Sequence, residues 1–180
     1  LNNNELNRLF DILLSDEFRG TTASNLIRFL LYTGARYQEA TTARWEDFDF
    51  ETNVWRRPFK ESKTKLAPPV AIGNRLLELV SEMKQQSSEG FLFKGRKEGT
   101  CIQSIRGSYT TIMKLAKIEN CSPHDLRRTF GTQILLSGQR IEDVQALLGH
   151  NNVRTTQKHY AFLNTEKLHN TINVLDNVMR

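Results

Sequence analysis

Residues 45–72 read WEDFDFETNVWRRPFKESKTKLAPPVAI, and this stretch decides the fold class. It holds aromatic and β-branched residues in short runs, and the polar sequences ETN and KESKTK separate these runs as turns do. The pattern predicts a small antiparallel sheet. Pro68 and Pro69 have no backbone N–H to give to a neighbouring strand, so we expect the third strand at an edge of the sheet.

The sequence on both sides of this stretch has the periodicity of helices. Leu6 and Phe10 belong to a set of apolar residues at helical spacing, behind cap residues that begin at Asn2. Gly34 is expected to stop the second helix, and Ser122 to open a long one. We therefore predict an α+β fold, mainly α-helical with one small antiparallel sheet. The expected helices cover residues 4–15, 22–32, a short segment from 36, 74–86, 103–116, 122–137, 141–148, 153–159 and 165–177, and residues 91–93 form a short buried strand or loop.

Length and composition fit a single domain spanning residues 1–180. The chain is 38% hydrophobic and 25% charged, which is ordinary for a globular protein with one core. It has no run of roughly 18 apolar residues and no signal peptide at its start, so we expect a cytoplasmic protein. Because the sequence begins with Leu1, it is expected to be part of a longer chain. Cys101 and Cys121 have no CxxC partner, which favours reduced thiols.

The basic residues are unevenly distributed. The formal charge is +5 and the isoelectric point is about 9.4, which makes nucleic acid one of several candidate partners. Between Lys94 and Lys117 there are six basic residues and one acid, Glu98. This segment is either a nucleic-acid surface or a merely solvated basic face.

Four motifs carry side chains that can act on a phosphate, although each alone has an ordinary explanation. His124 and Arg127 share one helical face near a helix start, where backbone amides also favour an anion. The Arg36 side chain can be braced by Glu39 three residues later, as in many surface ion pairs. A histidine after a helix, as at 150, is usually a C-terminal cap, and a lone tyrosine, as at 160, is usually half-buried core.

Taken in order, these motifs resemble the tyrosine recombinase (phage integrase) family. The sequence contains TGAR with Glu39, a hairpin SKT, HDLRRT, LGH and a following tyrosine, from Thr33 to Tyr160. Several spaced motifs in one order are far more specific than any one of them. The resemblance implies the fold of that catalytic domain over nearly the whole chain, and a function as a site-specific recombinase or integrase.

The resemblance also implies a set of catalytic residues. The family's hairpin lysine corresponds to Lys63, although Lys60 and Lys65 lie in the same turn region. Its nucleophile corresponds to Tyr160 rather than Tyr109, which precedes the HDLRRT motif. The full implied set is Arg36, Lys63, His124, Arg127, His150 and Tyr160.

The chemistry of DNA cleavage explains these residue types. Arginine grips two phosphate oxygens at once, and tyrosine, with an ordinary pKa near 10, needs a base such as His124. Lys63 would protonate the leaving 5′-oxygen, and His150 would donate a hydrogen bond to the phosphate. The implied product is a 3′-phosphotyrosine. No cofactor, ATP or metal is implied, and the sequence contains no Walker loop or carboxylate cluster spaced for magnesium.

The sequence leaves three other functions as alternatives. A DNA-binding accessory protein could keep the fold without cutting DNA, but binding phosphate needs no tyrosine. A type IB topoisomerase-like enzyme shares the chemistry, whereas the LGH motif is more similar to recombinases. A metalloprotein using Cys101, Cys121, His124 and His150 would have a ligand spacing that matches no common zinc site.

Double-stranded DNA is the partner that the family resemblance implies, with no membrane. Within the basic segment, the candidate backbone contacts are Arg106, Lys114 and Lys117. Family members usually carry an N-terminal core-binding domain that closes a clamp on DNA, and we expect residues 1–180 not to include that domain. The resemblance also implies a monomer when free and a tetramer on DNA, joined through the helix at 165–177, although its apolar residues could instead pack on their own domain. These are Leu168, Ile172, Val174 and Leu175, together with Leu163 just before the helix.

Overall fold

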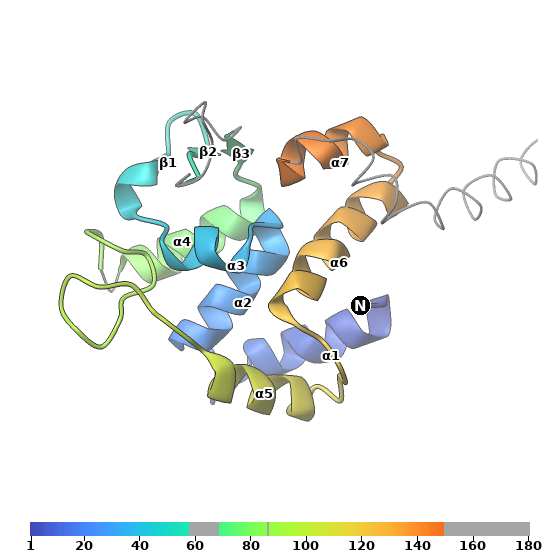
Figure 1. Ribbon diagram of the computed structural model, residues 1–180, viewed down its shortest axis with the longest axis horizontal. Helices are drawn as coiled ribbons and strands as arrows, with labels where there is room; N and C mark the ends of the chain where they lie inside the picture. Colours follow the sequence, from blue (N-terminus) through green and yellow to red (C-terminus); the bar gives the residue numbers. More distant parts are fainter. Residues whose placement is uncertain (58–68, 86, 150–180) are drawn as a thin grey trace, which may run out of the picture. The chain divides into compact units, whose positions relative to one another are not determined.

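The structure is a computed structural model that describes residues 1–57, 69–85 and 87–149. The chain forms two compact units, residues 1–130 and 131–180, with the boundary inside one helix. No helix among the described residues is long and apolar enough to cross a membrane. The elements, labelled in Figure 1, are α1 (Asn3–Leu13), α2 (Thr22–Thr33), α3 (Tyr37–Thr41), the short 3-10 helix η1 (Trp45–Asp47), β1 (Phe48–Asp49), β2 (Val54–Trp55), β3 (Val70–Ala71), α4 (Asn74–Lys84), α5 (Arg106–Leu115), α6 (Pro123–Leu136) and α7 (Ile141–Leu148).

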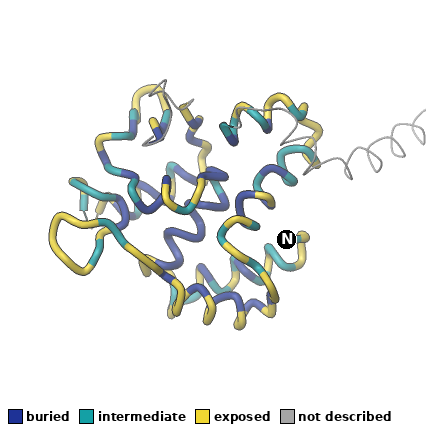
Figure 2. Tube along the Cα trace, in the orientation of Figure 1, coloured by how far each residue is buried: buried dark blue, intermediate teal, exposed yellow. Residues whose placement is uncertain are grey.

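Helix α2 is the centre of the first unit. Nearly all of its residues are buried, and it packs against α1, α3 and α4 (Figure 2). The ring of Phe29 on α2 lies 5.0 Å from the ring of Trp55 and 5.5 Å from that of Phe93, in edge-to-face contacts. Such aromatic contacts add to the free energy gained from apolar burial. These contacts join α2 to the sheet within one core and so fix the position of the end of α2.

The predicted antiparallel sheet is confirmed. Its strand order is β1-β2-β3, with Phe48 opposite Trp55 and Val54 opposite Ala71. β3 lies at the edge, as the two prolines before it predicted. The start of this stretch differs from the prediction, because Trp45 belongs to η1 rather than to a strand. The Asp47 carboxylate accepts the Arg44 N–H at 2.8 Å and stabilises that turn.

Most predicted helices are present with shifted ends. The Asn2 side chain accepts the Glu5 N–H at 2.9 Å, so α1 begins at the expected cap. The helix predicted at 103–116 begins instead at Arg106, because the Ile105 N–H donates to the Tyr37 hydroxyl at 3.2 Å. The helices predicted at 153–159 and 165–177 lie outside the described residues.

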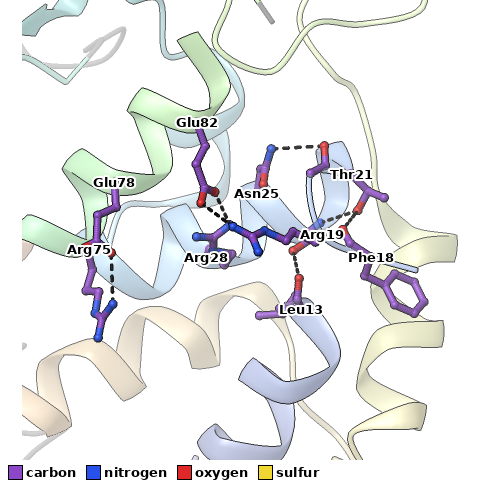
Figure 3. Close-up of polar contacts among 11 residues, drawn as sticks. Leu13, Phe18, Arg19, Thr21, Asn25, Arg28, Arg75, Glu78 and Glu82 are labelled. Carbon is purple, nitrogen blue, oxygen red and sulfur yellow. Dashed lines mark hydrogen bonds and ion pairs between the residues drawn. The ribbon is translucent and has the colours of Figure 1, made fainter. Parts of the chain in front are cut away.

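A charged contact fixes α2 to α4 (Figure 3). The Glu82 carboxylate on α4 accepts from Arg28 at 3.2 Å and from Arg19 at 3.1 Å. Arg28 is buried, whereas Glu82 and Arg19 are partly open to solvent. A buried guanidinium requires such a partner, because an uncompensated charge inside a protein is costly.

The second unit is described over residues 131–149. It contains the end of α6 and the whole of α7, whose Val144 and Leu148 are buried. The Asp143 carboxylate accepts the Arg140 N–H at 3.1 Å at the start of α7. Gly149 ends the helix with φ 65°, in the left-handed region where glycine is favoured. Helix 141–148 and its glycine stop therefore agree with the prediction.

Candidate active site

A tight turn after α2 places the first arginine. Gly34 caps α2 in the left-handed conformation, with φ 61°. The Thr33 hydroxyl donates to the Phe29 carbonyl at 2.7 Å and accepts the Ala35 N–H at 3.2 Å, and Ala35 is buried. Because these contacts fix the turn, Arg36 is held at the start of α3.

Glu39 braces Arg36 in the way that the sequence spacing predicted. Its Oε2 accepts the Arg36 backbone N–H at 2.9 Å, and its Oε1 accepts from Arg36 Nη1 at 2.7 Å. The Arg36 side chain is 49% exposed, whereas that of Glu39 is 10% exposed. The arginine therefore has part of its surface open to solvent, while its brace lies inside the protein.

Helix α6 carries His124 and Arg127. The Asp125 carboxylate accepts from the Ser122 backbone N–H at 3.0 Å and from the Ser122 hydroxyl at 2.6 Å, which stabilises the helix start. These contacts, the Ser122 hydroxyl first, lower the pKa of Asp125 below its usual value. His124 is exposed, and Arg127 is only 2% exposed.

The buried Arg127 connects α6 to the turn before Arg36. Its Nη1 donates to the Gly34 carbonyl oxygen at 2.6 Å. Arg36 lies two residues after Gly34, so Arg127 contacts the turn that immediately precedes the other predicted catalytic arginine. Lys63, His150 and Tyr160 lie outside the described residues, and their placement stays a prediction.

A third arginine, Arg57, belongs to this cluster and was missed by the motif reasoning. Its Nη1 lies 3.9 Å from Glu39 Oε2, and its side chain is 1% exposed. Burial is the largest influence on the pKa of Arg57 and lowers it; Glu39 acts to raise it and Arg36 to lower it. A sequence signal existed, because Arg57 follows Trp55 by two residues, and in an extended segment residues two apart point to the same face.

The three predicted DNA contacts lie on or just after α5. Arg106 begins the helix, Lys114 is in its last turn, and Lys117 follows with φ 55°. Lys114 and Lys117 line an open hollow of about 680 Å³ together with Tyr109 and Cys121. The structure thus brings these two lysines to one concave surface.

Tyr109, the alternative nucleophile, lies at the side of this hollow. It is buried, and its hydroxyl is 3.6 Å from the Cys121 sulfur. Burial raises the pKa of Tyr109 above its usual value, with a smaller contribution from the contact with Cys121. Because attack requires the phenolate, a raised pKa argues against Tyr109 as the nucleophile.

Curated relatives share this sequence over part of their length. The chain is 29% identical to prophage integrase IntF of Escherichia coli (strain K12) over 140 residues, covering 77% of this chain and 30% of the relative. It is 30% identical to tyrosine recombinase XerC of Staphylococcus aureus (strain JH9) over 160 residues, covering 86% of this chain and 54% of the relative. The chain thus spans between about a third and about half of the length of these relatives.

Solved structures share the fold. The crystal structure of XerA recombinase matches with a TM-score of 0.75 and 23% identity, over 94% of this chain and 64% of that one. The catalytic domain of bacteriophage HP1 integrase matches with a TM-score of 0.68 and 24% identity, over 90% of this chain and 86% of that one. XerH recombinase bound to palindromic difH substrate, in a post-cleavage complex, matches with a TM-score of 0.75 and 20% identity, over 98% and 53% of the two chains.

The sequence of the whole described region and beyond matches one family. A profile of the phage integrase family covers residues 1–167 of the 180 in the chain. The named relatives, the mainly helical fold with its small sheet, and the turn shared by Arg36 and Arg127 agree with that match. The chain therefore belongs to the phage integrase family of tyrosine recombinases and integrases.

Proposed function

We propose that this chain is the catalytic domain of a site-specific DNA recombinase that cleaves and rejoins strands through a 3′-phosphotyrosine. The observation that carries the proposal is the contact between Arg127 and the Gly34 carbonyl, which brings a buried arginine to the turn that holds Arg36. Two guanidinium groups can then grip the non-bridging oxygens of one phosphate. Membership of the phage integrase family supports the same activity.

The proposed cleavage step balances protons and bonds. The Tyr160 oxygen forms a bond to the phosphorus while the bond to the 5′-oxygen of the next nucleotide breaks. His124 accepts the phenol proton, and Lys63 gives a proton to the departing 5′-oxygen, leaving a 5′-hydroxyl. Arg36, Arg127 and His150 stabilise the charge that builds on the phosphate oxygens in the transition state.

Rejoining is the same reaction in reverse. A 5′-hydroxyl from a new strand attacks the phosphotyrosine, loses its proton to Lys63 and releases Tyr160. The energy of the broken phosphodiester is kept in the phosphotyrosine bond, so no external energy source is required by the proposed cycle. The substrate is double-stranded DNA, and the reaction takes place in the cytoplasm.

The basic residues of α5 and the segment after it are proposed to contact the DNA backbone. Lys114 and Lys117 share one hollow, and Arg106 begins the same helix. Cationic side chains on a concave surface match the phosphate groups of a duplex. We further propose a free monomer that forms a tetramer on DNA, with residues 165–180 docking on a neighbouring subunit.

A covalent-adduct experiment tests the proposal. The chain is incubated with a randomised pool of duplexes that carry a nick beside each candidate cleavage position. Loss of the short 5′-hydroxyl fragment traps the phosphotyrosine, and sequencing the trapped DNA recovers the cleaved site. We expect an adduct with a defined sequence. DNA binding without any adduct would favour a non-cleaving accessory protein, and relaxation of supercoiled DNA without sequence preference would favour a topoisomerase.

A further inference from the structure

The two neighbouring arginines after β2 point in opposite directions. The Arg56 side chain is 70% exposed and pairs with Asp49 on the sheet surface at 3.1 Å. Arg57 has the same inward parity as the fully buried Trp55, and almost none of its side chain reaches solvent. An arginine at an inward position is expensive to bury, so it needs a specific partner. Glu39 is one partner of opposite charge, with its Oε2 3.9 Å from Arg57 Nη1.

The Glu39 carboxylate is shared between two guanidinium groups. Its Oε1 is 2.7 Å from Arg36 Nη1, and its Oε2 is 3.9 Å from Arg57 Nη1. The same Oε2 also accepts the Arg36 backbone N–H at 2.9 Å. A movement of the Glu39 carboxylate relative to one arginine therefore also changes its distance to the other, because both guanidinium groups lie beside this one carboxylate.

The charge of this group decides what Arg36 can offer to an anion. Two arginines and one glutamate leave a net charge of +1, whereas Arg36 and Glu39 alone would sum to zero. Charges that are largely removed from water interact more strongly than exposed ones. Arg57 thus offsets the glutamate that braces Arg36, and the group of Arg36, Glu39 and Arg57 stays positive.

We propose that Arg57 is a positioning residue for Arg36 that acts through Glu39. It holds the carboxylate from the inner side, so that the brace fixes Arg36 without cancelling its attraction for phosphate. Arg57 also immediately precedes residues 58–68, the segment that contains Lys63. This inference rests on the proposed strand cleavage, since it assigns a role in gripping the same phosphate.

The first test compares Arg57→Met with Arg56→Met, which removes the same charge one residue away. We expect Arg57→Met to slow formation of the trapped adduct about tenfold or more, less than the roughly 100- to 1,000-fold loss typical of a donor that touches the oxyanion. Arg56→Met should form the adduct within about twofold of the wild-type rate, because surface ion pairs contribute little. Equal rates for Arg57→Met and wild type would overturn the inference while leaving the proposed function intact.

A second variant separates charge from packing. Arg57→Met leaves the group neutral, but Glu39→Gln combined with Arg57→Met returns it to +1. We therefore expect the double variant to cleave faster than Arg57→Met alone. If Arg57 only fills space or links two elements, removing Glu39 as well must add damage, and a double variant slower than Arg57→Met would overturn the inference. Melting curves by circular dichroism identify any variant that fails to fold. If Arg57→Met does not fold, Arg57→Lys takes its place: because it keeps the charge we expect a rate close to that of the wild type, and a loss of about tenfold or more would overturn the inference.

A third measurement changes the substrate instead of the protein. Replacing one non-bridging oxygen of the recovered cleavage site by a methyl group gives a methylphosphonate without negative charge. The ratio of the wild-type cleavage rate to the Arg57→Met cleavage rate should be smaller on this substrate, because the phosphorus group then carries less negative charge for the arginines to stabilise. An unchanged ratio would indicate a purely structural role and overturn the inference. Absence of any adduct from the wild-type chain would overturn the proposed function, and this inference with it.

Discussion

Arg127 Nη1 donates a 2.6 Å hydrogen bond to the carbonyl oxygen of Gly34, 93 residues earlier in the chain. This contact ties α6 to the end of α2 inside the first unit. The contact involves one nitrogen of a planar guanidinium group that carries several N–H donors. The same residue therefore supports the fold and is proposed to bind the substrate.

Replacing Arg127 by lysine should separate DNA binding from cleavage. The lysine keeps the charge but loses the planar donor pair and cannot serve Gly34 and a phosphate in the same way. We expect adduct formation to slow by about 100- to 1,000-fold with DNA affinity little changed, and the same for Arg36→Lys. Arg128→Lys is the matched control, since Arg128 is half-exposed beside Asp125. A normal cleavage rate for Arg127→Lys would remove it from the proposed site.

Tyr160→Phe should abolish the covalent adduct while leaving stability and DNA affinity nearly unchanged. The substitution removes one oxygen and keeps the ring. Denaturing electrophoresis of the trapped complex measures the adduct directly. Tyr109→Phe should still form it, because the Tyr109 hydroxyl is buried against Cys121. An adduct with Tyr160→Phe would move the nucleophile to another tyrosine.

Lys63→Ala should be rescued by changing the leaving group. A substrate with sulfur in place of the bridging 5′-oxygen releases a thiolate, which leaves without being protonated. Single-turnover cleavage of this substrate should approach the wild-type rate for Lys63→Ala, whereas Tyr160→Phe should stay inactive. Lys60→Ala and Lys65→Ala serve as controls within the same turn region. Rescue confined to Lys65→Ala would move the proton donor two residues along the chain.

Neutral substitutions at Arg106, Lys114 and Lys117 should weaken DNA binding and flatten its dependence on salt. Each lost phosphate contact lowers the slope of log K against log salt by about 0.9 for duplex DNA. Arg75→Gln on α4 is the control, because its exposed guanidinium pairs with Glu78. Fluorescence anisotropy with a labelled duplex at several salt concentrations measures both quantities. An unchanged slope would return this segment to an ordinary solvated surface.

The start of α6 should respond to acid through Asp125. The Ser122 hydroxyl holds the pKa of Asp125 below its ordinary value, so the stabilisation is complete above that ordinary value and is lost as pH falls through the lower, folded one. Ser122→Ala should therefore reduce stability at neutral pH more than at about pH 2. Urea denaturation across this range measures the difference. If Ser122→Ala lowered the free energy of unfolding equally at neutral and at acidic pH, the titration of Asp125 would be excluded as the source of the loss.

The sequence predicted a helix boundary correctly where one cap residue determines it. Gly34 and Gly149 end α2 and α7 in the left-handed conformation, and Asn2 caps α1. The predicted start of α5 was wrong, because the observed start depends on a hydrogen bond from the Ile105 N–H to the hydroxyl of Tyr37, which lies 68 residues earlier. Contacts between distant segments leave no periodic pattern, so the sequence alone does not reveal them.

The residue types of the candidate site come from the sequence motifs, whereas the contacts among these residues come from the fold. The motifs pointed to Arg36, His124 and Arg127, and the brace from Glu39 followed from its spacing of three residues. The contact from Arg127 to Gly34 and the burial of Arg57 both arise from how α6 and the sheet pack in the first unit. Strand parity alone could have placed Arg57 inward, but only the fold shows that Glu39 meets it.

The position of the two tryptophans has a practical consequence for spectroscopy. Trp45 and Trp55 are the only two in the chain, and both are buried within residues 1–130. Intrinsic tryptophan emission therefore reports on the first unit and is blind to the unfolding of residues 131–180. A melting curve followed by emission should be compared with one followed by backbone circular dichroism, which records both units. Any lag between the two curves would measure how far the segment carrying Tyr160 unfolds independently of the arginines that it is proposed to serve.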